Sequence, residues 1–155
     1  MMHALTELIK SDMKPALGVT EPGAIAFAVS TAKAHIKGTV KRVRLRLNSG
    51  MYKNAFTCGI PGTSEVGNYY AAALGAVAAD PKKGLECLEG IGKAEEDAAG
   101  EMIKAGMISV SMSSITSRIF IEATVTGEDS EAVVTIQDAH TNITKITENG
   151  TVVFE

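Results

Sequence analysis

Apolar residues follow a helical spacing in the first two thirds of the chain and alternate with polar residues in the last third. The helical spacing, often carried by alanine, predicts helices over residues 1–13, 20–36, 64–79 and 93–105, with a short helical turn at 85–88. Alternation predicts half-buried strands over 40–48, 108–112, 119–126, 132–137, 143–147 and 152–154. Residues 51–58 fit a strand or an extended loop. This order predicts one α+β domain spanning residues 1–155, with alanine-rich helices packed on one face of a largely antiparallel sheet.

Local signals place the main breaks between these elements. Lys14-Pro15 ends the first helix, because the residue before a proline is disfavoured in the helical conformation. Thr20 is expected to be the N-cap of the second helix, with Glu21 and Pro22 in its first turn. Asn149-Gly150 predicts a tight hairpin near the end of the chain.

Composition excludes several classes of function. The net charge of −3 offers no general attraction for nucleic acid or anionic lipid, and the basic residues at 41–46 alternate with apolar ones as on the solvent face of a strand. The sequence has no apolar run long enough to span a membrane and no signal-peptide pattern, so we expect a cytoplasmic protein. Two cysteines, Cys58 and Cys87, cannot supply the three or four thiolates of an iron–sulfur cluster. We expect both to be neutral thiols, and no metal site in this chain.

Three short segments are candidates for chemistry, at residues 18–22, 59–67 and 138–142. In the first two, a glycine-containing turn leads into a helix N-terminus, which favours a bound anion such as a carboxylate, although simple helix capping explains the pattern as well. His140 in the third segment could bind a carboxylate or exchange a proton, or be purely structural. Lys53, followed by Asn54, could pair with a substrate carboxylate or be merely solvated.

Taken together, these segments resemble a known family. The matching stretches are KPALGVTEP at 14–22, KN at 53–54, IPGT at 60–63 with Gly67, AALG at 72–75, HTNI at 140–143 and VVF at 152–154. Their order and spacing are similar to those of the N-terminal substrate-binding domain of the L-cysteine desulfidase and L-serine dehydratase alpha-chain-like family of iron–sulfur lyases. The resemblance covers almost the whole chain.

The resemblance implies an α,β-elimination on L-cysteine or L-serine, which yields pyruvate, ammonia and either sulfide or water. It implies that Thr20 and Thr63 receive the substrate carboxylate, that Glu21 receives the ammonium group, and that His140 and Asn142 close the pocket from the sheet side. Glu21 and His140 are the expected catalytic residues. The expected substrate-binding residues are Thr20, Lys53, Asn54, Gly62, Thr63, Thr141 and Asn142.

Two departures from the family pattern qualify this inference. Family members often carry a cysteine where this chain has Val19, and their longer chains carry the cluster cysteines in the later half. We therefore expect no cofactor in this chain, an iron–sulfur cluster in a missing or partner half, and no activity of the isolated chain. The expected partners are a small amino acid and a cluster-bearing domain or subunit. A homo-oligomer is compatible with the sequence, which leaves the oligomeric state open. The alternative is a non-catalytic domain that binds small amino acids or serves subunit assembly.

Overall fold

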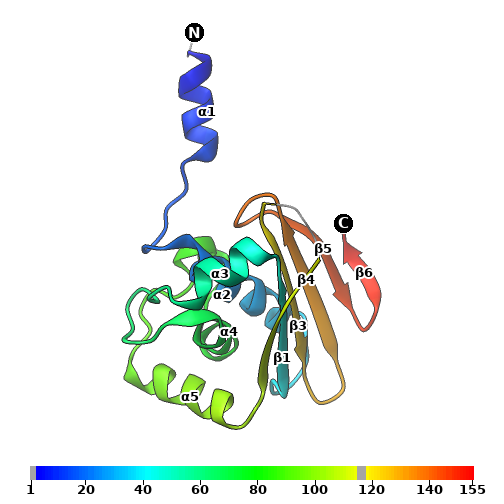
Figure 1. Ribbon diagram of the computed structural model, residues 1–155. Helices are drawn as coiled ribbons and strands as arrows, with labels where there is room; N and C mark the ends of the chain where they lie inside the picture. The colour runs from blue at the N-terminus through cyan, green and yellow to red at the C-terminus, as the bar shows by residue number, and fades with distance from the viewer. Residues whose placement is uncertain (1–2, 115–117) are drawn as a thin grey trace.

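The chain folds into helices on one side of a six-stranded sheet, as a computed structural model describes for residues 3–114 and 118–155 (Figure 1). The helical elements are α1 (Ala4–Asp12), α2 (Thr20–Ala34), α3 (Ser49–Phe56), α4 (Gly67–Val77), the 3-10 helix η1 (Pro81–Glu86) and α5 (Lys93–Lys104). The strands are β1 (Arg42–Leu47), β2 (Ile108–Met112), β3 (Phe120–Thr126), β4 (Glu131–Gln137), β5 (Ile143–Glu148) and β6 (Thr151–Phe154). These elements confirm the α+β class.

The sheet has the strand order β2-β1-β3-β4-β5-β6. The β1–β2 pair is parallel and every other neighbouring pair is antiparallel, which confirms the largely antiparallel prediction. Along β1, Val43, Leu45 and Leu47 are buried against the helical layer, whereas the intervening arginines are exposed. Two of these arginines pair with glutamates of β3 and β4 on the open face, so the basic run is the solvent side of a strand.

Small side chains allow the two central helices to approach closely. Ten of the fifteen residues of α2 are buried, and most residues of α4 are buried as well. A Cβ atom added at Gly75 of α4 would lie 2.9 Å from the carbonyl oxygen of Ala26 and 2.9 Å from the Cβ of Val29. The alanine-rich composition of these helices therefore reflects the short distance between their axes.

One predicted element is wrong. Residues 51–58 do not form a strand or an extended loop, because most of this segment belongs to helix α3. Met51 and Ala55, four positions apart, are both buried, and the rings of Tyr52 and Phe56 stack with centroids 6.1 Å apart. The helix begins after Asn48, whose side-chain oxygen accepts a hydrogen bond from the backbone of Phe120 at 3.0 Å.

Two helix starts also differ from the prediction. The N-cap of α2 is Val19, without a side-chain hydrogen bond, and Thr20 is the first helical residue. Its hydroxyl turns instead toward Glu21 and His140, as described below. Helix α4 starts at Gly67 rather than residue 64, because Gly59 and Val66 form a β-bridge that holds the preceding residues in a loop. Among the described residues, no helix has the length and apolar content that a bilayer crossing requires.

Candidate functional site

Four polar side chains from three separate elements meet at the start of α2. The Thr20 hydroxyl lies 3.3 Å from Nε2 of His140 and 3.4 Å from Oε2 of Glu21. The side-chain amide of Asn54, on α3, donates to the other oxygen of Glu21 at 3.3 Å. His140 comes from the loop between β4 and β5. We call Thr20, Glu21, Asn54 and His140 the polar cluster.

The number of protons on the Thr20 hydroxyl determines which groups donate and which accept in the polar cluster. The Thr20 hydroxyl has one proton and donates it to Glu21, so it can only accept from His140. That arrangement requires the imidazole tautomer with its proton on Nε2, which leaves Nδ1 as the acceptor of the ring. The hydroxyl thereby connects an imidazole to a carboxylate.

The electrostatic environment keeps two neighbouring groups uncharged near neutral pH. Burial lowers the pKa of His140 below 6.5, and the carboxylate of Glu21 opposes this shift without cancelling it. Burial and, to a smaller extent, the charge of Glu21 raise the pKa of the Cys58 thiol above 9.0. The thiol of Cys58 donates a hydrogen bond to the backbone oxygen of Asn54. A neutral imidazole beside a carboxylate is suited to accept a proton.

A cavity of about 450 Å³ lies beside the polar cluster, within the usual size range of small-ligand sites. One wall is the chain that follows α1, where the ammonium group of Lys14 donates to the hydroxyl of Thr141 at 3.0 Å. The opposite wall is the loop after β4. The lining residues are Ser11, Asp12, Lys14, Thr20, Leu85, Ala139, His140, Thr141 and Asn142.

The second glycine-containing segment also approaches the start of α2, but its threonine is engaged locally. A Cβ atom added at Gly18 would lie 3.2 Å from the ring of Pro61. The backbone N–H of Thr63 donates to the oxygen of Ile60, and its hydroxyl bonds to Ile60 and Glu65. Thr63 thus organises its own turn. Gly62 has a left-handed φ of 80° at the tip of this turn.

The remaining expected site residues fall in two places. Lys53 is exposed on α3, one residue before Asn54 of the polar cluster. Thr141 and Asn142 line the cavity together with His140. The side-chain amide of Asn142 donates to the backbone oxygen of Gln137 at 3.0 Å, so one part of its role is to close the loop.

Sequence reasoning missed Lys14 and Cys58 as neighbours of the site. Lys14 lies within the first matching stretch, but its position before a proline suggested only a helix break. Cys58 was evaluated only as a metal ligand or a neutral thiol, without a place near the site. Interpreting residues 51–58 as a helix would have placed Asn54 and Cys58 on one side of it, because residues four apart share a helix face.

The thiols of the described residues do not fit an iron–sulfur cluster. Cys87 is buried against the backbone oxygen of Gly23, and burial raises its pKa to about 12. Cys58 lies elsewhere, with its thiol bonded to Asn54. The described part of the chain has no group of three histidine, cysteine or acidic side chains arranged to hold a metal ion. Such a cluster would need thiolates from another polypeptide segment.

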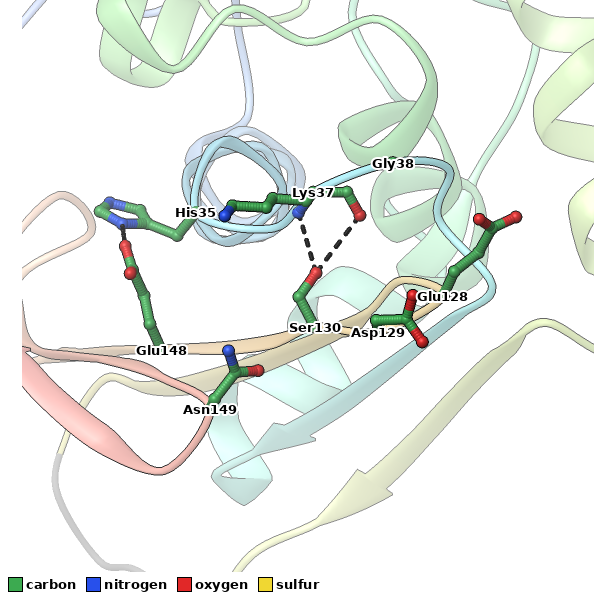
Figure 2. Close-up of a pocket in the computed structure, with 8 residues that line it drawn as sticks. All are labelled: His35, Lys37, Gly38, Glu128, Asp129, Ser130, Glu148 and Asn149. Carbon is green, nitrogen blue, oxygen red and sulfur yellow. Dashed lines mark hydrogen bonds and ion pairs between the residues drawn. The ribbon is translucent and has the colours of Figure 1, made fainter.

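A second cavity of about 450 Å³ lies at the other end of α2, and Figure 2 shows its polar lining. Here Nδ1 of His35 lies 2.6 Å from a carboxylate oxygen of Glu148. The hydroxyl of Ser130 accepts from the backbone N–H of Lys37 at 2.8 Å and bonds to its carbonyl oxygen. These contacts join the end of α2 to the β3–β4 and β5–β6 turns, so we assign this cavity a structural role.

Comparison with known proteins gives matches that carry no described activity. No protein-family model matches the chain, and no solved structure matches it. It is 39% identical over 151 residues to a UPF0597 protein of Clostridium botulinum strain Okra, and 36% identical over 153 residues to another UPF0597 protein of that strain. These alignments cover 97% and 99% of this chain but 35% of each relative. The chain is therefore homologous to about a third of the length of UPF0597 proteins.

Proposed function

We propose that this chain is the substrate-binding part of an iron–sulfur-dependent lyase that performs α,β-elimination on L-cysteine or L-serine. The observation that carries the proposal is the contact between Thr20 and His140. These residues are 120 positions apart in sequence, yet the Thr20 hydroxyl lies 3.3 Å from Nε2 of His140. Both belong to stretches that resemble the lyase family. The cavity beside them is large enough for a small amino acid.

The polar cluster supplies complementary groups for such a substrate. The carboxylate of Glu21, held by Thr20 and Asn54, is the partner for the substrate ammonium group. The neutral imidazole of His140 is the group that can accept the proton from the α-carbon. Lys14 and the hydroxyl of Thr141 offer donors for the substrate carboxylate from the cavity wall.

The iron–sulfur cluster belongs, in this proposal, to a further polypeptide segment. The two thiols of this chain do not fit it, and the relatives are almost three times as long as the part that matches. The isolated chain is therefore expected to be colourless and inactive when prepared without oxygen.

The test is kinetic and uses the assembly with its cluster-bearing part. Glu21→Gln and His140→Ala should each reduce kcat/KM for L-cysteine or L-serine at least about tenfold, which corresponds to about 1.4 kcal/mol of transition-state stabilisation. Glu148→Gln and His35→Ala are matched controls, because this pair lies at the opposite end of α2. Unchanged kinetics in both polar-cluster variants would refute the assignment.

A second candidate is a domain that binds a small amino acid without chemistry. It is favoured by Val19, which stands where the lyase family often has a cysteine and can neither ionise nor bind iron. Calorimetric titration of the isolated chain with L-cysteine and L-serine tests it. Binding that Glu21→Gln weakens, in an assembly that turns over neither amino acid, would favour this candidate over the lyase.

A further inference from the structure

The first helix presents an apolar stripe that the rest of the described chain does not cover. Leu5, Leu8, Ile9 and Met13 follow the spacing of one helix face, and each is more than half exposed. Helix α1 buries no residue, and Figure 1 shows it standing away from the helical layer. A helix of nine residues is only marginally stable in water without packing. Its stripe is therefore suited to contact with another surface.

A second group of exposed apolar side chains lies at the starts of α2 and α4 and at the end of α3. Leu17 and Val19 precede the start of α2, Phe56 ends α3, and Val66 and Tyr69 flank the start of α4. We call these five residues the site patch. Contacts between their sequence neighbours bring these segments together, since Gly18 approaches Pro61 and Gly67 approaches the backbone oxygen of Phe56.

The candidate cavity lies between the end of α1 and the β4–β5 loop, and it reaches Thr20, the residue after Val19 of the site patch. Ser11, Asp12 and Lys14, at the end of α1 and just after it, form one wall, whereas Thr20 and His140 belong to the other. A body that covers both the α1 stripe and the site patch would also close this cavity to solvent. Exposed apolar surface beside a binding site is typical of a protein–protein interface.

The length of the relatives favours one occupant over a second copy of this chain. The chain aligns over 153 residues with a Clostridium botulinum UPF0597 protein but covers only 35% of it, so each such relative has a further body of nearly twice this length. A second copy of this chain would add only another Cys58 and another buried Cys87, and these do not fit the iron–sulfur cluster that the proposed function requires.

We propose that the α1 stripe and the site patch form one docking surface for a polypeptide homologous to the remaining two thirds of the UPF0597 proteins. That body closes the candidate cavity from the side of α1. The choice of occupant rests in part on the proposed function, whereas the existence of the docking surface rests on exposure and placement alone.

Hydrogen exchange tests the proposal on two intact proteins, this chain and the Clostridium botulinum relative that aligns over 153 residues. In the free chain, the amides of Ala4–Asp12 should exchange almost as fast as in an unstructured peptide, because α1 buries no residue. In the relative, the aligned segment should exchange at least about a hundredfold more slowly, since opening it requires breaking an interface. Equal exchange rates in both proteins would overturn the proposal.

Self-association is the other outcome that would overturn it. The mass of the free chain should be that of a monomer in light scattering across a wide concentration range. A dimer that the Leu8→Ser, Ile9→Ser double variant dissociates would assign the stripe to a second copy. Val152→Ser, on β6, is the matched control, because Val152 is 44% exposed and lies outside the docking surface.

The docking surface and the proposed chemistry can fail separately. Slow exchange of the aligned segment in the relative, combined with unchanged kinetics of the Glu21 and His140 variants, would support the docking surface and refute the lyase assignment. Fast exchange of that segment, combined with impaired kinetics of the variants, would refute the docking surface and support the lyase assignment.

Discussion

Glu21 couples the candidate site electrostatically. Its carboxylate accepts from Thr20 and Asn54, and its charge raises the pKa of both His140 and Cys58. Thr20 and Glu21 are adjacent at the positive end of the α2 dipole, which stabilises a carboxylate at this position. One residue thus connects an imidazole, a thiol and a helix terminus.

Replacing Glu21 should change the titration of His140 in a defined direction. Because the Glu21 carboxylate raises the pKa of His140 against the effect of burial, Glu21→Gln should lower that pKa further below 6.5. The measurement is an NMR titration of the His140 ring protons in both proteins. Glu148→Gln, beside His35, should leave the pKa of His140 unchanged. A higher pKa in Glu21→Gln would contradict the arrangement described for the polar cluster.

The lowered pKa of His140 makes the stability of the folded chain depend on pH. A histidine whose pKa is lower in the folded chain than in the unfolded chain takes up its proton preferentially on unfolding. The contribution of His140 to the free energy of unfolding is therefore complete above pH 6.5. It is lost as the pH falls from 6.5 through the pKa of His140 in the folded chain.

At the scale of elements, the close contact of α2 with α4 depends on glycine, which has no side chain, at position 75. Gly75→Ala would place a methyl group 2.9 Å from Ala26 and Val29, where the backbone of α2 has little freedom to move. We expect a loss of about 1–3 kcal/mol in the free energy of unfolding, typical of overpacking, measured by chemical denaturation. At Gly59 an added Cβ meets nothing within 4 Å, so Gly59→Ala should have a much smaller effect. Equal effects of the two variants would show that the helices are not in close contact.

Helix α3 shows why a local pattern was insufficient for one element. Its eight residues span two turns, too few for a helical period to be distinguished from alternation. The buried residues Met51 and Ala55 pack on other elements, and Asn48 fixes the helix start through a bond to Phe120. That bond joins residues 72 positions apart, so tertiary structure selects the helix.

For the whole molecule, α1 is an appendage of an otherwise compact body (Figure 1). A variant that lacks residues 1–12 should keep the melting temperature of the full chain within about 2 °C, because α1 buries no residue. Differential scanning calorimetry is the measurement. Ile25→Ala provides the comparison, because Ile25 is fully buried in α2 and its substitution should cost about 2–5 kcal/mol. A large loss on truncation would show that α1 packs on the body of the chain.

The amino-acid sequence was sufficient for the α+β class and for all six strands of the sheet, because periodic burial and helix-breaking residues act over short distances. Thr20, Glu21, Asn54 and His140 were singled out by their side-chain chemistry and by the family resemblance, not by periodicity. Their meeting was decided by the sheet order, which places the β4–β5 loop beside the start of α2. The exposure of α1 was likewise decided by the tertiary structure, since an apolar stripe of this spacing is equally typical of a helix packed on the core.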